Sequence, residues 1–224
     1  MYALQQFTDK RFLPTLSIKE GANLEVVYQI KLVGLVVTSN MGWNEHVNYT
    51  IQRVNRTLWQ LTRFKRLGAD RVKLVQFYIL KIRSILMFGA VCYHSALTLD
   101  QRNKLELQQK RSLAIILGRD YKHYSQARAL VNLPELEDLR EQACLRWAKK
   151  AQSSPSHSHL FPVNTSDFNT RNKKAFLEFN CKSAKYYNSA IPSMAQALNR
   201  NGVQSSISQK LIVITTNSGA IITV

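Results

Sequence analysis

The sequence predicts a mainly α-helical fold with a small antiparallel β unit at the N-terminus and an irregular C-terminal tail. From Asn44 to Gly118 the apolar residues recur every three or four positions, as on one face of an amphipathic helix. Before that segment, β-branched residues alternate with turn residues in a way that is typical of strands. Hydrophobic residues make up 45% of the 224 residues, which is enough to form a core. We therefore expect a β segment over residues 1–43, a helical bundle with a helical extension over 44–152, and a linker with a partly disordered tail over 153–224.

The expected β unit contains a few short strands. Residues 12–18 alternate between apolar and polar side chains, and residues 19–22 form a plausible turn around Gly21. Residues 24–38 follow as a run rich in β-branched residues, and Gly34 within it predicts a bulge or a close approach to its backbone. A unit of this size needs a larger partner sheet or a helix to be stable.

Three helices of similar length are expected next, and three such helices with short connections form a bundle. The first begins at Asn44, a fair N-cap residue, and ends before Gly68, a good residue for the C′ position. The second covers residues 71–87 and the third covers residues 98–117. The residues expected on their buried faces are Val47, Ile51, Val54, Leu58, Leu61 and Phe64 or Lys65; then Val72, Val75, Tyr78 or Ile79, Ile82 and Ile85 or Leu86; then Leu99, Leu105, Gln108 or Gln109, Ser112 or Leu113, and Ile116.

Residues 121–152 add two shorter helices, the first of them over residues 125–130. The second starts at Pro134 and has acidic residues in its first turn, where they complement the helix dipole. Residues 153–159 have the composition of a linker. The bases and tyrosines of residues 182–187 suit contact with nucleotides, and tyrosines packed on the bundle explain the pattern at least as well.

The net charge of +17 is concentrated in the middle of the chain. Residues 1–50 are neutral overall, whereas residues 51–200 hold 26 basic and 10 acidic residues, a net charge of +16. Such an excess repels itself unless a polyanion offsets it, so it favours a nucleic acid or an anionic membrane as the partner. The alternative is that these bases only solvate the outer face of the helices.

The apolar residues and the cysteines argue against several classes of protein. The longest nearly apolar run, over residues 85–93, is far shorter than the roughly 20 residues that span a bilayer, so we expect no membrane partner. No secretory signal is visible, and three widely spaced cysteines fit a reducing compartment better than a disulfide framework. We therefore expect an intracellular protein, in the nucleus or the cytoplasm.

No pattern of residues points to catalysis or to a cofactor. His157 and His159 lack the cysteine pair that would support a zinc site, and Cys144 has no arrangement of nucleophile, base and orienting group. The glycine-rich loops that bind phosphates or dinucleotides are missing from the sequence. We therefore expect no cofactor, no metal ligand and no catalytic residue in this chain, and interpret it as a basic binding module.

Several segments match, in the same order, the pattern of one known family. Leu24–Asn44, with Lys31-Leu-Val-Gly34 inside it, is similar to a "K-L-L-G-…-S-D-L-K-W" segment. Leu58–Gly68 is similar to "L-x-x-L-R-R-L-K-x-L-G", and Gln108–Gly118 is similar to "V-Q-K-R-A-L-R-I-I-L-G". The remaining similar segments are Arg140–Lys150 ("R-R-E-x-L-C-L-x-F-A-K-K"), His159–Pro162 and Tyr186–Pro192. In this order they resemble the reverse transcriptases of non-LTR retrotransposons of the LINE or jockey type.

The resemblance implies that the chain is the C-terminal part of an RNA-directed DNA polymerase. Residues 31–34 would belong to the primer grip at the edge of the palm, and residues 44–118 to the thumb, a helical bundle that holds the RNA/DNA template–primer. In the family, aspartates of the palm hold two divalent metal ions, Mg²⁺, and their F/Y-A-D-D box lies upstream of the matched segments. The expected partners are thus the template–primer and the missing palm and fingers, and polymerase activity is not expected from this chain alone. Val33 stands where the family has Leu, and Met41 and Gly42 also depart from the pattern, as in a drifted copy.

The charge pattern and the resemblance together predict a surface that binds the phosphate backbone without regard to base sequence. The expected contacts come, in some subset, from Lys31, Gly34, Arg53, Arg56, Arg63, Lys65, Arg66, Lys73, Lys81, Arg83, Lys110 and Arg111.

Two alternatives stay open on the sequence alone. In the first alternative the chain is a non-catalytic protein-interaction module. In the second it is a non-functional transposon remnant that still folds. A third class, the AlkB-type demethylases, is excluded because its iron site needs an H-x-D motif, and His46-Val-Asn48 lacks the acid.

Overall fold

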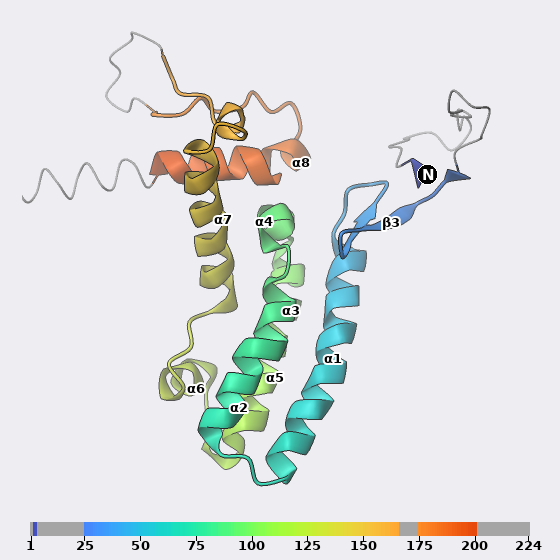
Figure 1. Ribbon diagram of the computed structural model, residues 1–224, viewed down its shortest axis with the longest axis vertical. Helices are drawn as coiled ribbons and strands as arrows, with labels where there is room; N and C mark the ends of the chain where they lie inside the picture. Colours follow the sequence, from blue (N-terminus) through green and yellow to red (C-terminus); the bar gives the residue numbers. More distant parts are fainter. Residues whose placement is uncertain (1, 4–24, 166–173, 201–224) are drawn as a thin grey trace, which may run out of the picture. The chain divides into compact units, whose positions relative to one another are not determined.

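The computed structural model describes residues 2–3, 25–165 and 174–200, and it is mainly helical, with 67% helix and a small two-stranded antiparallel sheet near the N-terminus (Figure 1). The mainly α-helical class predicted from the sequence is therefore confirmed. The strand and turn expected over residues 12–22 lie outside the described residues. The chain divides into two compact units, one of residues 1–90 with 97–139 and the other of residues 91–96 with 140–224.

A tight hairpin opens the first unit. Strands β3 (Gln29–Leu32) and β4 (Leu35–Thr38) pair in antiparallel fashion, and the loop between them consists of Val33 and Gly34 alone. Both loop residues have positive φ angles, of 48° and 85°, as in the turns that match the twist of a hairpin. Gly34 is thus a turn residue and not a bulge, so the second of the two predicted alternatives applies. The expected close approach is confirmed, because a Cβ atom added to Gly34 would lie 2.9 Å from the ring of Phe88.

A much shorter ladder lies before the hairpin. It pairs β1 (Tyr2–Ala3) with β2 (Glu25–Val26) in parallel.

Helix α1 (Asn44–Arg66) covers the range that the sequence predicts. Its N-cap residue is Trp43, which provides no side-chain cap, so the N-cap role expected for Asn44 is wrong. The Asn44 side chain instead accepts a hydrogen bond of 2.6 Å from the amide nitrogen of Gln101. Gly68 follows the helix with a φ angle of 84°, as predicted for the C′ position.

The second predicted helix is present but is not a regular α-helix. Helix α2 (Arg71–Phe77) continues into the π-helical segment η1 (Tyr78–Arg83) and then into α3 (Ser84–Met87). The wide turns of a π-helix keep residues spaced by four on one face, so that this face remains buried through the segment. Its buried residues are Leu74, Tyr78, Ile82 and Leu86. Val72, expected on this face, is exposed, and Leu74 is buried in its place.

The stretch Arg71–Ala96 is also long and apolar enough to cross a membrane, judged by length and composition alone. It is longer than the apolar run over residues 85–93 on which the sequence-based expectation rested. A helix from a protein core passes the same test. Here α2, η1 and α3 pack against α1, but only 28% of the apolar window is buried.

Helix α5 (Leu99–Leu117) is the third long element of the first unit, and it packs against α1 and α2 (Figure 1). A capping box starts it, in which Thr98 and Gln101 bond to each other's backbone N–H groups. The predicted buried face is confirmed from Leu105 onward. Leu99 is 73% exposed, because six residues before Leu105 is about 240° around the helix and therefore off that face.

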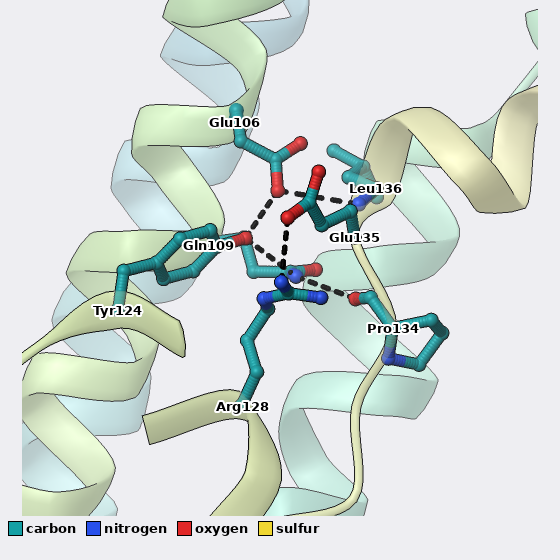
Figure 2. A network of polar contacts seen from close by, with 7 residues as sticks. All are labelled: Glu106, Gln109, Tyr124, Arg128, Pro134, Glu135 and Leu136. Carbon is teal, nitrogen blue, oxygen red and sulfur yellow. Dashed lines mark hydrogen bonds and ion pairs between the residues drawn. The ribbon is translucent and has the colours of Figure 1, made fainter. Parts of the chain in front are cut away.

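Two shorter helices follow in the predicted places, α6 (Tyr124–Leu130) and α7 (Leu136–Gln152). The side chain of Gln109 on α5 is fully buried and forms hydrogen bonds with residues in or next to these two helices. Its amide nitrogen donates to the hydroxyl of Tyr124 at 2.8 Å and to the carbonyl of Pro134 at 2.9 Å (Figure 2).

Two tyrosines and a carboxylate extend the same network around Gln109. The hydroxyl of Tyr78 donates to the amide oxygen of Gln109, and the hydroxyl of Tyr124 donates to the carboxylate of Glu106. That carboxylate also accepts the backbone N–H of Leu136 at 3.2 Å, as Figure 2 shows. Burial, together with the Glu106 carboxylate, raises the pKa of Tyr124. The network therefore fixes α6 and the start of α7 on α5, while the second carboxylate oxygen of Glu106 is buried without a hydrogen-bond partner among the described residues.

The second unit has a core of its own and is more regular than its sequence suggests. A helix covers residues 190–200, and the side chain of Asn199 bonds both the N–H and the carbonyl of Phe176, at 2.9 and 3.1 Å. Arg140 is fully buried and donates to the ring of His94 at 3.3 Å. The buried apolar residues of this core are Ala148, Ala151, Phe161, Phe176, Met194, Ala195 and Leu198.

Candidate nucleic-acid interface

A row of cations and aromatic rings runs along the solvent side of α1. We define this basic stripe as Tyr49, Arg53, Arg56, Trp59, Arg63 and Arg66. Its members recur every three or four residues, so they share one side of the helix and extend over about 26 Å at 1.5 Å per residue. The other side carries the buried residues Val47, Val54, Leu58 and Leu61. The stripe therefore faces away from the core of the first unit.

Tyr49 is the point at which the stripe meets β3. The ammonium group of Lys31 donates a hydrogen bond of 2.7 Å to the Tyr49 hydroxyl and lies 4.6 Å from the centre of the ring. The guanidinium group of Arg53 lies 5.7 Å from the same centre. The hydrogen bond from Lys31 lowers the pKa of Tyr49, and the charges of Lys31, Arg53 and Arg56 lower it further. Three cations from two elements thus act on one exposed hydroxyl.

Trp59 and Arg63 form the other end of the stripe. The guanidinium group of Arg63 lies 5.4 Å from the centre of the Trp59 ring, and the indole is 62% exposed. Both side chains line a shallow surface hollow together with Arg66 and Leu67. This end of the helix therefore combines an accessible aromatic face with two positive charges.

The cations of the stripe form no ion pair with a carboxylate among the described residues. The ion pairs that those parts of the chain contain lie elsewhere: Arg71–Asp120, Lys73–Asp70, Arg102–Glu137, Lys104–Asp100, Arg128–Glu135 and Lys174–Glu178. On α1 itself the one acidic residue is Glu45, in the first turn. Within the part of the chain that the structure describes, the positive charge of the stripe is thus not offset by a paired carboxylate.

Lys65 was expected to contact phosphate, but in the structure it caps a helix. Its ammonium group donates to the carbonyl oxygens of Ile115 and Ile116, the latter at 3.3 Å, in the last turn of α5. These carbonyls have no partner within the helix, and a cation there also complements the helix dipole. Lys65 is therefore a structural residue and is not counted in the stripe.

The two expected residues on α5 have defined contacts of their own. Arg111 donates to the side chain of Asn55 at 2.9 Å, which brings it beside α1. Lys110 and Arg128 lie 5.0 and 5.1 Å from the centre of the Tyr124 ring. Arg111 can therefore extend the positive surface of α1, whereas Lys110 belongs to the surroundings of Tyr124.

The remaining expected residues lie on other elements. Lys73 is on α2, with its charge 3.7 Å from the carboxylate of Asp70, and Lys81 and Arg83 are on η1. Gly34 supplies a turn and a close contact, as described above. Within the segment that resembles a primer grip, Lys31 is the residue that the structure joins to the stripe.

Tyr49 and Trp59 were missed as candidate site residues. The signal for them was present, because both fall on the polar side of a helix that otherwise carries arginines. An aromatic residue on such a face is easily taken for part of the core, and only its exposure in the folded chain shows otherwise.

Neither a metal centre nor a known relative helps to define this interface. Within the described ranges, no three His, Cys, Asp or Glu side chains are grouped so that they could hold a metal ion. Comparison with protein-family models, with curated proteins and with solved structures finds no match to this chain. Its function therefore has to be inferred from the geometry and charge of the interface and from the resemblance of its motifs.

Proposed function

We propose that this chain binds the sugar–phosphate backbone of a nucleic acid through the basic stripe of α1. The observation that carries the proposal is the distribution of ion pairs. In other parts of the described chain carboxylates form ion pairs with cations. The arginines of the stripe form no ion pair with a described carboxylate. Guanidinium groups bind phosphate oxygens through paired hydrogen bonds, and such contacts position a protein on nucleic acid without reading its sequence.

The resemblance to non-LTR reverse transcriptases narrows the ligand to an RNA/DNA template–primer. In this proposal the helices α1, α2 to α3, and α5 act as a thumb, and Lys31 acts as part of the primer grip. The aspartates and the two Mg²⁺ ions of the family belong to the palm, so we assign no catalytic residue to this chain and expect no polymerase activity from it alone. The proposed setting is intracellular, in the nucleus or the cytoplasm.

A salt titration of binding tests the proposal directly. The full chain is mixed with a fluorescent RNA/DNA duplex, and the dissociation constant is measured by anisotropy between about 50 and 200 mM salt. Each phosphate neutralised contributes about −0.9 to the slope of log K against log salt on B-DNA, so we expect a steep negative slope. No binding at low salt, or a flat slope, would overturn the proposal.

Matched variants separate the stripe from the general positive charge. The double variant Arg56→Gln with Arg63→Gln removes two stripe cations and should reduce the steepness of the slope by about two. The control, Arg71→Gln with Lys104→Gln, removes the same charge at exposed sites that are paired with Asp120 and Asp100. It should leave the slope nearly unchanged. Equal losses in both double variants would show that net charge alone attracts the ligand.

The same protein preparation also tests the protein-interaction alternative. A partner that stays bound after nuclease treatment, and that is bound equally well by the stripe variant, would favour that alternative over nucleic-acid binding.

A further inference from the structure

Trp59 places a large indole on the solvent side of α1. It is 62% exposed, although its neighbours in sequence, Leu58 and Leu61, are buried in the core of the first unit. Phe64 and Phe77 pack against each other with ring centres 5.8 Å apart, and both line a hollow together with Trp59. An apolar contact therefore lies close to the exposed indole.

Two shallow hollows meet at the indole. One is lined by Trp59, Thr62, Arg63, Arg66 and Leu67. The other is lined by Trp59, Gln60, Arg63, Phe64, Leu67 and Phe77. Trp59, Arg63 and Leu67 thus line both hollows, and the indole is accessible to a ligand in either of them.

The surroundings of the indole decide which kind of ligand suits it. Arg63 lies over the ring, Arg66 lines the same hollow, and no described carboxylate forms an ion pair with either arginine. A flat aromatic group that carries negative charge beside it matches both features. A nucleobase with its phosphate is such a group, and stacking of bases on aromatic side chains between cations is a general mode of single-strand binding.

We propose that Trp59 stacks an unpaired base of a strand whose phosphates lie along the basic stripe. Bases inside a duplex are already stacked on one another, so the base that Trp59 takes must be unpaired. The preferred ligand is then a duplex that continues into a single strand, rather than a blunt duplex. This inference rests on the proposed function, because it places the phosphates on the same stripe.

Binding to three otherwise identical duplexes tests the inference. One is blunt, one carries a short single-stranded overhang, and one carries an overhang of abasic nucleotides, which keeps the phosphates and lacks the bases. The full chain should bind the normal overhang about ten-fold or more tightly than the abasic overhang, the range that one stacked base provides. Trp59→Leu should lose this preference and keep its affinity for the blunt duplex, whereas Trp59→Phe should keep much of the preference.

Leu107→Ala is the matched control, because Leu107 is also an exposed apolar residue and lies on α5, outside the set of residues that line the two hollows. It should retain the preference for the normal overhang. Equal binding of the normal and abasic overhangs, or an equal loss of all three ligands in Trp59→Leu, would overturn the stacking role while the backbone-binding stripe stands. No binding of any of the three duplexes by the unaltered chain would overturn both the proposed function and this inference.

Discussion

The ammonium group of Lys31 donates a hydrogen bond of 2.7 Å to the hydroxyl of Tyr49, and it lies over the ring of the same residue. This contact joins the hairpin to α1 and adds a fifth positive charge at the end of the stripe, beside its four arginines. Because the contact is exposed, it can be tested without disturbing the core.

Replacing Lys31 with Met should raise the pKa of Tyr49 toward its ordinary value of 10.0, because the hydrogen bond from Lys31 is the largest cause that lowers it. Tyrosine ring-carbon NMR shifts followed against pH measure the change at this one residue. Lys73→Met, which removes an exposed cation paired with Asp70, should leave the titration of Tyr49 unaltered. An unchanged pKa in Lys31→Met would show that the contact does not form in solution.

Two glycine substitutions separate backbone strain from steric contact. Gly34 and Gly68 have nearly equal φ angles of 85° and 84°, but only an alanine at position 34 meets a neighbour, the ring of Phe88 at 2.9 Å. Gly68→Ala should lower the free energy of unfolding by about 1–2 kcal/mol, from strain alone. Gly34→Ala should cost more, because Phe88 must also move. Chemical denaturation measures both variants, and equal losses would argue against the close packing of the hairpin on Phe88.

Loss of Gln109 should destabilise the first unit strongly. Gln109→Leu would remove the hydrogen bonds of this side chain to the hydroxyl of Tyr78 and the carbonyl of Pro134, while the hydroxyl of Tyr124 would keep its bond to Glu106. Each buried group left unpaired costs about 1–3 kcal/mol, so we expect a loss of several kcal/mol in the free energy of unfolding. Gln108→Leu is the control, because the bonds of that side chain are local, to Lys104 and Arg111. It should cost clearly less in the same denaturation experiment.

Lys65 and Arg66 are adjacent cations, but we expect Lys65 to contribute to stability and Arg66 to nucleic-acid binding. Lys65→Met removes the cap on the carbonyls of Ile115 and Ile116 and should lower the free energy of unfolding by about 1 kcal/mol. Arg66→Met should leave stability nearly unchanged and instead weaken binding to the RNA/DNA duplex. Thermal denaturation measures the stability of both variants, and anisotropy measures their affinity for the duplex. A loss of stability in Arg66→Met but not in Lys65→Met would contradict the assignment of Lys65 as a cap.

His46 should make the stability of the first unit depend on pH. Its ring nitrogen Nδ1 accepts the backbone N–H of Val36 at 3.3 Å, which requires the unprotonated ring. Burial and then the charge of Arg53 lower the pKa of His46 below its ordinary value of 6.5. The unfolded chain therefore binds the proton more readily, so the contribution of His46 is present above pH 6.5 and is lost as the pH falls below it.

Denaturation curves recorded from neutral to mildly acidic pH measure this effect. His46→Gln should have a flatter dependence of stability on pH than the unaltered chain, because the glutamine has no proton to take up in this range. Parallel curves for the two proteins would show that His46 does not contribute.

Much of the helical framework could be predicted because it depends on local chemistry. The ends of α1 and α5 follow from turn residues such as Gly68 and Gly118, whose positive φ angles terminate helices. The buried faces follow from the three- and four-residue spacing of apolar side chains. The failures, at Val72 and Leu99, fall at helix starts, where a residue can leave the buried face at little cost in packing.

The roles of individual polar residues could not be predicted in the same way. Asn44 has the chemistry of an N-cap, yet its amide bonds Gln101. Lys65 has the chemistry of a phosphate contact, yet it caps α5. In both cases the side chain could bond to either of two partners with similar strength. The fold determines which of these partners lies within hydrogen-bonding distance.

The sequence by itself determined the mainly helical class, the extent of the long helices and the accumulation of positive charge, since each depends on residues close together in the chain. Only the tertiary structure decided which cations have no ion pair with a carboxylate of the described residues and which aromatic rings lie beside those cations. Tyr49 meets Lys31 from a strand, and Trp59 stays exposed beside Arg63, because the packing of α1 on its neighbours leaves that one side of the helix open. Charge can be counted along a chain, but its pairing is settled by distances between segments that are far apart in sequence.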